Sequence, residues 1–212
     1  MLDIIIPTFK RPHSLDRASK NAHENTKSKH TLTFVVEPDD QESIDKIKEL
    51  GENLLISKYP GNHTGAANTA YEETKEPFFI IANDDFNFHP NWDVPALEKM
   101  NDETIGVVGL NDGKSQRFTT ITLVRRKYIQ EHSGVMDMPN TLYYPGYNHN
   151  YVDTEFSNTA MRRNMFAICP ESVVEHMHWA FGKSQMDPTY EKSNKTSSQD
   201  AHTYSQRQHL WQ

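Results

Sequence analysis

Two adjacent aspartates, Asp84 and Asp85, follow an apolar run at residues 78–82 and a single asparagine, Asn83. Two like charges at the end of a buried strand repel each other, so a cation beside them would stabilise the pair. Hard divalent cations such as Mg²⁺ take carboxylate oxygens as ligands and bridge them to substrate phosphates. The alternative is that the pair caps a helix over residues 90–100, because aspartate is a good N-cap residue. The place of the pair at the end of an apolar run favours the metal site.

Two histidines lie two positions apart, at His176 and His178. Residues 172–178 alternate as in a strand, and alternate strand residues share a face, so both imidazoles can point the same way. Imidazole is a good ligand for Mn²⁺ and its neighbours. A lone histidine is more often a surface or core residue. We expect one of this pair to complete a coordination shell that the aspartates begin.

A helix predicted over residues 151–164 begins with two acids, Asp153 and Glu155. Two positions on a helix differ by about 200°, so both cannot face one cleft. One is therefore the working acid, and the other is solvated or capping. Asp153 would lie in the first turn, where the helix dipole favours the ionised carboxylate that a general base needs. The alternative is an acid placed only for helix stability.

Small side chains open another predicted helix, at Gly65, Ala66 and Asn68. Small residues let a bulky ligand approach the backbone, and the amides at a helix start attract phosphate. Helices with small residues are also common without a ligand.

The elements that would position these residues alternate between strand and helix. Continuous apolar runs predict strands buried on both faces of a largely parallel sheet, and helices between them give a βαβ pattern. Ligands of such sheets bind beyond the carboxyl ends of the strands. Every predicted strand end in the first half carries polar residues, so we expect them to converge on one edge. The predicted strands are 2–6, 31–36, 54–57 and 78–82, and the predicted helices are 13–24, 41–50 and 64–75.

The second half is mixed. We predict strands at 105–110, 118–124 and 172–178 and helices at 125–132 and 151–164, with Val152, Phe156 and Met161 on the inner face of the last helix. The domain division that we expect is a catalytic domain at residues 1–182 and a polar C-terminal tail at residues 183–212. The composition of the tail favours mobility. A closing helix over residues 199–211 is the alternative.

Bulk properties narrow the class of protein. A length of 212 residues suits one domain, and a net charge of −7 shows no overall nucleic-acid footprint. The single Cys169 excludes an intramolecular disulfide and a multi-cysteine zinc site, and it fits a reducing cytoplasm. The N-terminal apolar run is too short for a signal peptide, and no apolar segment approaches the ~20 residues that span a bilayer. We expect a cytoplasmic protein without a membrane contact.

Several segments together resemble family 2 inverting glycosyltransferases with the GT-A fold, over residues 1–182. The resemblance implies one α/β domain with a Rossmann-like, mixed and mainly parallel sheet flanked by helices. The small size, with "NFHPNW" and "PGYNHNYVDTEF", is similar to phage-encoded glycosyltransferases, some of which decorate hydroxymethylated bases in phage DNA and would act in the host cytoplasm. The segments that carry the resemblance are "IIIPTFKRP", "VVEPDD", "GNHTGAANTAYEE", "ANDDF", "VDTEFSNTAMRR" and "VVEHMHW".

The resemblance also implies a role for each candidate residue. Mn²⁺ or Mg²⁺ would be held by Asp85 and by His176, which we prefer to His178. Asp153 would be the base that deprotonates the acceptor hydroxyl, and a UDP-sugar would be the donor. Acceptor contacts are expected at Asn111, Asp112 and Trp179. The expected nucleotide contacts are Pro7, Thr8, Arg11, Glu37, Asp39, Gly65, Ala66, Asn68 and Asp84.

Two other functions fit part of the pattern. A nucleotidyltransferase would share the nucleotide site, but such enzymes generally carry a glycine-rich stretch after the first strand, and residues 7–12 contain no glycine. A non-catalytic sugar-binding module would keep the sheet and its aromatic residues but would not need Asp153. The sequence favours metal-dependent, inverting transfer of a hexose or pentose to a hydroxyl of a polysaccharide, a small molecule or modified DNA. It leaves the sugar, the acceptor and the oligomeric state open.

Overall fold

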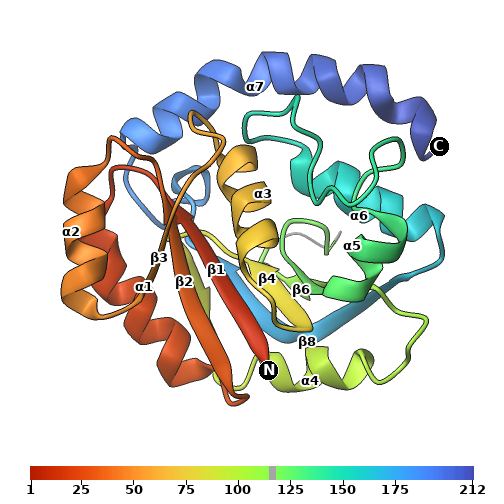
Figure 1. Cartoon of the computed structure of the whole chain (residues 1–212), viewed down its shortest axis with the longest axis horizontal. Helices are drawn as coiled ribbons and strands as arrows, with labels where there is room; N and C mark the ends of the chain where they lie inside the picture. The colour runs from red at the N-terminus through yellow and green to blue at the C-terminus, as the bar shows by residue number, and fades with distance from the viewer. Residues whose placement is uncertain (115–117) are drawn as a thin grey trace.

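The core of the structure is one mixed β-sheet with helices on both faces (Figure 1). The structure is a computed structural model that describes residues 1–114 and 118–212. In these residues eight strands form a sheet in the order β3-β2-β1-β4-β7-β6-β8-β5. The strands are β1 (Leu2–Thr8), β2 (His30–Val36), β3 (Asn53–Ile56), β4 (Phe78–Ile81), β5 (Phe86–Phe88), β6 (Val107–Asn111), β7 (Thr122–Arg125) and β8 (Phe166–His176).

The strand directions follow the predicted division of the chain. β1 pairs in parallel with β2 and β4, and β2 pairs in parallel with β3. The second half is mixed, because β7 runs antiparallel to β4 and β6, while β8 runs parallel to β6 and antiparallel to β5. This confirms a single α/β domain with a mixed sheet that is parallel throughout its first half.

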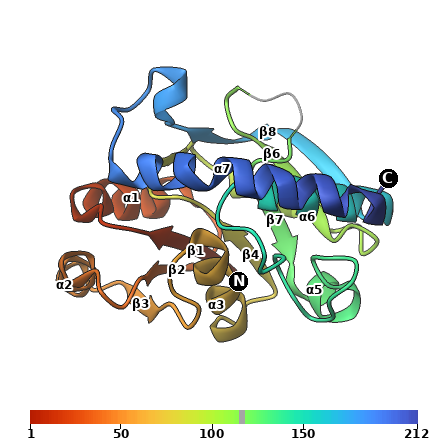
Figure 2. The same cartoon turned by 90° about the horizontal axis from the view of Figure 1, so that it is seen from above.

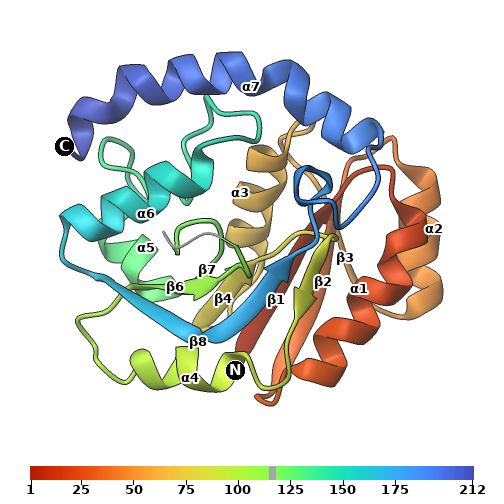
Figure 3. The ribbon, with the colours of Figure 1, turned by 180° about the vertical axis from the view of Figure 1, so that it is seen from behind.

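Helices cover both faces of the sheet, as Figures 1 and 3 show. Residues of β1 alternate between two apolar clusters: Leu2, Ile4 and Ile6 pack with α1, α2 and α4, whereas Ile5 packs with α3, α5 and α6. The strand is therefore buried on both sides, as its continuous apolar run predicts. The helices are α1 (Pro12–Asn25), α2 (Gln41–Leu50), α3 (His63–Glu73), α4 (Asp93–Lys99), α5 (Arg126–His132), α6 (Val152–Arg162) and α7 (Pro188–Arg207), with short 3-10 helices η1 (Trp179–Phe181) and η2 (Gln208–Leu210).

The long helix α7 lies across one end of the molecule, where the parallel strands have their carboxyl ends (Figures 1 and 2). It begins at Pro188, and the Asp187 side chain caps it by accepting hydrogen bonds from the amides of Thr189 and Tyr190. The Thr189 hydroxyl also donates to the carbonyl of Phe9, directly after β1, at 2.7 Å. The sequence composition favoured a mobile tail here, but a helix far longer than the alternative at 199–211 forms.

Some predicted boundaries are wrong. The strand predicted from residue 118 begins only at Thr122, because Phe118 has a φ of 55°, which a strand does not allow. The last strand runs from Phe166 to His176, so His178 lies beyond it. Met161, predicted on the inner face of α6, is 38% exposed. None of the described helices combines the length and the apolar character that crossing a membrane requires.

Candidate active site

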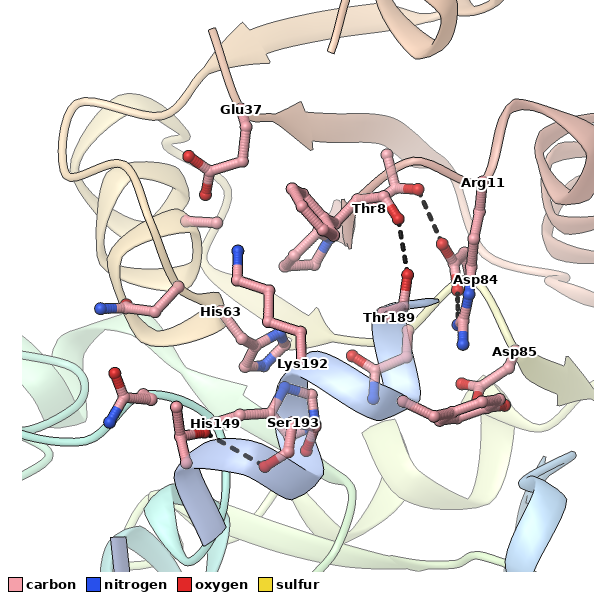
Figure 4. A pocket seen from close by; sticks show the side chains of 18 of the residues that line it. Thr8, Arg11, Glu37, His63, Asp84, Asp85, His149, Thr189, Lys192 and Ser193 are labelled. Carbon is pink, nitrogen blue, oxygen red and sulfur yellow. Dashed lines mark hydrogen bonds and ion pairs between the residues drawn. The ribbon is translucent and has the colours of Figure 1, made fainter. Parts of the chain in front are cut away.

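A pocket opens at the carboxyl edge of the parallel strands, and we call it the main pocket. It gathers residues from the ends of β1, β2, β4 and β8, from the start of α3, from the 148–149 segment and from α7 (Figure 4). The convergence expected from the strand ends is therefore found. The predicted site residues in its wall are Pro7, Thr8, Arg11, Glu37, Ala66, Asp84, Asp85, His176 and His178.

The adjacent aspartates have different partners. Both oxygens of Asp84 are occupied, by the Thr8 hydroxyl at 2.7 Å and by the Arg11 guanidinium at 2.6 Å. Burial raises the pKa of Asp84, although the charge of Arg11 opposes that effect. Arg11 in turn binds Asp187, the residue that caps α7. Asp84 is thus a structural link between β1, β4 and the start of α7.

Asp85 keeps one oxygen without a partner. Its Oδ2 accepts from the Tyr190 hydroxyl at 2.7 Å and lies 3.3 Å from Nε2 of His176. Its Oδ1 is buried and has no hydrogen-bond partner among the described residues. Burial would raise the pKa of Asp85, but His176, Tyr190 and Arg11 outweigh it and hold that pKa well below its usual value. A buried oxygen without a partner costs stability, and a ligand that binds it would recover that cost.

The helix-cap alternative for the two aspartates is wrong. Helix α4 begins at Asp93, and its N-cap is Trp92, without a side-chain capping bond. Asp84 and Asp85 instead lie in the turn between β4 and β5.

His178 also lines the main pocket, but one of its nitrogens is in use. Its Nδ1 accepts a hydrogen bond from the Ala180 amide at 3.2 Å and so caps η1. Its ring packs 5.0 Å from that of His176 and 4.7 Å from that of Tyr190, centre to centre. Burial and the neighbouring His176 lower the pKa of His178. Among the two histidines, His176 is the one in contact with Asp85.

A second cavity holds Asp153 in its wall. It adjoins the main pocket, because His63, Asn83 and His149 line both. Thr154 donates to one oxygen of Asp153 from its amide at 2.8 Å, and the other oxygen, Oδ2, has no hydrogen-bond partner among the described residues. Burial raises the pKa of Asp153 to about 6 despite these bonds. The expectation that the helix start would favour ionisation is therefore corrected: desolvation is the larger effect.

The second acid of α6, Glu155, is neither solvated nor capping. It is 1% exposed, accepts three hydrogen bonds from the Arg207 guanidinium, and takes a fourth from the Tyr147 hydroxyl at 2.7 Å. Arg207 also binds Asp137. Asp153 and Glu155 do face different ways, as helical spacing requires. Glu155 forms a buried ion pair with Arg207, and this pair connects α6 to α7.

Of the two acids predicted after β2, only Glu37 lines the main pocket. Its Oε2 accepts from the Gly61 amide at 2.7 Å, and burial raises its pKa. Asp39 is exposed and lies outside the wall. The chain turns directly after Glu37, and Asp40 is used to cap α2, which leaves Asp39 facing solvent.

The small residues of α3 divide between two faces. Ala66 lines the main pocket, whereas Gly65 and Asn68 line a hollow on the other side of the helix. A Cβ on Gly65 would lie 1.9 Å from the carbonyl oxygen of Tyr59, so glycine is needed for packing. Asn68 exchanges two hydrogen bonds of 2.9 Å with the backbone of Tyr143. Neither residue faces the main pocket, because they lie three apart on the opposite helical face.

The predicted acceptor residues lie close to the end of β8 but outside the two cavities. Asn111 donates to the carbonyl of Pro170 at 3.1 Å, and the carbonyl of Asp112 accepts from the amide of His176 at 3.0 Å. Trp179 is in η1, with its ring centre 6.5 Å from that of Tyr190. Their contact with an acceptor stays a prediction.

The main-pocket residues that the sequence reasoning missed include His63, His149, Tyr190 and Lys192. The two histidines stood in segments already singled out, so their residue type was a usable signal. Tyr190 and Lys192 lie on α7, whose polar composition gave no sign of a helix over the site. Figure 4 shows His63, His149 and Lys192 on one side of the pocket and Arg11, Asp84 and Asp85 on the other.

Solved structures of other proteins match this chain over nearly its full length. A mannosyltransferase from Pyrobaculum calidifontis, in complex with GDP-mannose and Mn²⁺, has a TM-score of 0.63 at 13% identity, over 95% of this chain and 69% of its own. A glucosyl-3-phosphoglycerate synthase from Mycobacterium tuberculosis, in complex with Mn²⁺, UDP and glucosyl-3-phosphoglycerate, has a TM-score of 0.67 at 10% identity, over 98% and 80%. The same synthase with Mg²⁺ and UDP has a TM-score of 0.65 at 10% identity, over 98% and 79%.

The TM-scores establish a shared fold, which is the GT-A fold expected from the resemblance. No curated protein sequence matches the chain. The model of one protein family, glycosyl transferase family 2, matches residues 3–175, which span all eight described strands except Leu2 of β1 and His176 of β8. The chain therefore belongs to glycosyl transferase family 2.

Proposed function

We propose that this protein transfers a sugar from a nucleotide diphosphate sugar, with UDP as the expected carrier, to an acceptor hydroxyl and with inversion at the anomeric carbon. One observation carries the proposal: Asp85, with a buried oxygen that lacks a partner, contacts His176 in the main pocket, beside the cavity of Asp153. Family membership and the nucleotide and metal complexes of the similar structures support it.

The main pocket has the polar groups to take the nucleotide. Glu37 offers a carboxylate to the hydroxyl or amide groups of the nucleoside, at a position fixed by Gly61. Lys192 brings a cation to the same wall, with its Nζ 3.8 Å from the ring centre of Phe9. Carboxylate and cation suit the two ends of a nucleoside diphosphate.

The residues present fit a divalent metal. A carboxylate and an imidazole in contact are ligands that Mn²⁺ accepts, and the unpartnered Oδ1 of Asp85 is available to it. No group of three or more His, Cys, Asp or Glu side chains in residues 1–114 and 118–212 could hold a metal without help. Asp85 and His176 would therefore share the ion with oxygens of the diphosphate, as Mg²⁺ sites commonly do. When bound, the ion would neutralise negative charge on the departing diphosphate.

Asp153 is placed to move the proton. Its free Oδ2 would accept the proton of the acceptor hydroxyl as the acceptor oxygen forms its bond to the anomeric carbon. The bond between that carbon and the diphosphate oxygen breaks, and the nucleoside diphosphate leaves with the electron pair. A single displacement inverts the configuration at the anomeric carbon. A pKa of about 6 leaves Asp153 ionised at neutral pH yet basic enough to take the proton.

Three classes of acceptor follow from the sequence: a polysaccharide, a small molecule and hydroxymethylated bases of phage DNA. Asn111, Asp112 and Trp179 are the acceptor contacts that we propose, near the end of β8.

The test is a turnover screen with Mn²⁺. UDP-glucose, UDP-galactose, UDP-N-acetylglucosamine and GDP-mannose are each incubated with the three acceptor classes, and released nucleoside diphosphate is measured. NMR of the product reports the anomeric configuration. We expect release with one donor and an inverted product. Binding of nucleotide sugars without any turnover would favour a binding module instead, and a retained configuration would contradict the single displacement.

A further inference from the structure

Two histidines lie at the junction of the main pocket and the second cavity. His63 and His149 line both spaces, and their ring centres are 4.8 Å apart. Neither imidazole has a hydrogen-bond partner in the described part of the chain. Burial is the main cause that lowers the pKa of His63 to about 3 and that of His149 to about 4, so both rings are neutral at pH 7. A neutral imidazole has one donor and one acceptor nitrogen, which is the hydrogen-bonding capacity that a sugar hydroxyl matches.

The backbones of both histidines are held firmly while their rings stay free. His63 is the first residue of α3, whose N-cap Asn62 accepts from the Gly65 amide at 2.7 Å. The amide of His149 donates to the carboxylate of Asp200 on α7 at 3.0 Å. Asp200 is fully buried and also accepts from the backbone amides of residues 148 and 150, each at 2.8 Å. Such anchoring fixes the backbone from which each ring extends toward the cavities.

The proposed reaction places the transferred sugar beside these two histidines. In a single displacement the anomeric carbon lies between the departing diphosphate and the attacking hydroxyl. The diphosphate belongs with Asp85 and His176 in the main pocket, and the hydroxyl belongs with Asp153 in the second cavity. The sugar must therefore lie where the two spaces meet.

We propose that His63 and His149 bind the hydroxyl groups of the sugar being transferred, and so contribute to the choice of donor. This proposal rests on the proposed function, which supplies the positions of the diphosphate and of the acceptor hydroxyl. Asn83 lines both spaces as well. The histidines are singled out because their rings lie together, 4.8 Å apart, without hydrogen-bond partners among the described residues, and come from two separately anchored segments.

The test compares the affinity for a nucleotide sugar with the affinity for its nucleotide alone. Calorimetry with Mn²⁺ measures UDP-glucose, UDP-galactose, UDP-N-acetylglucosamine and GDP-mannose against UDP and GDP, in wild type, His63→Ala and His149→Ala. We expect the sugar-dependent part of the affinity to fall by about three- to tenfold for each variant, the size of one hydrogen bond, while UDP binding is unchanged. His63→Gln, which keeps a donor and an acceptor, should retain more of it than His63→Ala. His202→Ala, at an exposed position of α7, is the matched control and should behave as wild type.

Each outcome is decisive. An unchanged ratio of nucleotide-sugar affinity to nucleotide affinity in both alanine variants overturns the inference, even where their thermal stability falls, because the rings would then serve packing alone. A wild-type protein that binds none of the nucleotide sugars overturns the proposed function itself, and the inference with it.

Discussion

At the scale of the residue, burial sets the chemistry of Asp153. An ordinary carboxyl has a pKa near 3.8, and burial raises that of Asp153 to about 6. Above pH 6 the carboxylate is ionised at a cost in stability, and below pH 3.8 that cost is absent, since the acid is protonated both folded and unfolded. The same desolvation that makes the carboxylate basic enough for catalysis makes the folded protein less stable at neutral pH.

Replacing the carboxylate should separate activity from stability. Asp153→Asn should lower kcat by about 10²–10⁴-fold, because the proton acceptor is lost, while donor affinity is retained. At pH 7 the same variant should raise the free energy of unfolding by about 1–2 kcal/mol, since no charge is buried. Turnover, calorimetry and urea unfolding measure the three quantities. Asp45→Asn, at an exposed position of α2, is the control. A variant that turns over like wild type would remove Asp153 from the mechanism.

The pH dependence of the reaction should report the same group. Because the ionised form is the base, kcat/KM should be level above pH 6 and fall about tenfold per pH unit below it. The profile is measured with saturating metal, and the residual activity of Asp153→Asn should lack this limb. A limb of equal slope in the variant would assign the titration to another group.

The sequence could identify residues whose chemistry shows in their neighbours along the chain. The acids after β4 were recognised from their place at a strand end, and His176 from its spacing with His178 in a predicted strand; Asp85 and His176 do meet. Which aspartate keeps a free oxygen could not be read, because Thr8 and Arg11 reach Asp84 from more than 70 positions away. The role of Glu155 likewise depends on Arg207, 52 positions later.

At the scale of the element, helices with an apolar stripe were predicted well. Helix α2 was expected at residues 41–50 and has those bounds, since Ile44 and Ile47 lie on its buried face. Helix α7 could not be found this way, because its buried residues include Asp200 and Arg207 and it is held by polar contacts instead of a stripe. Its N-terminal half lines the main pocket, so the site is incomplete without it.

The ion pair between α6 and α7 should therefore be a large contribution to stability. Arg207→Met leaves Glu155 buried without its cation, and such a loss typically costs about 3–5 kcal/mol. Urea unfolding measures the change. Arg162→Met, at an exposed position of α6, is the matched control and should change stability by less than about 0.5 kcal/mol. Equal stability of the two variants would mean that α7 is not fastened through this pair.

At the scale of the whole molecule, the two halves of the sheet serve different parts of the proposed reaction. The parallel half, β1 to β4, ends in the residues placed for the nucleotide, whereas α6, between β7 and β8 of the mixed half, brings Asp153 to the adjoining cavity. β8 crosses back to β5 and carries His176 to Asp85. Helix α7 spans both halves, from Arg11 at its start to Glu155 near its end.

The most direct test of this account is the affinity for UDP with and without Mn²⁺, measured by calorimetry in wild type, Asp85→Asn and His176→Ala. If these residues and the diphosphate share a metal, Mn²⁺ should raise the affinity of wild type for UDP at least about tenfold, or 1.4 kcal/mol. The increase should be much smaller in both variants. Wild-type affinity that is the same with and without Mn²⁺ would contradict it.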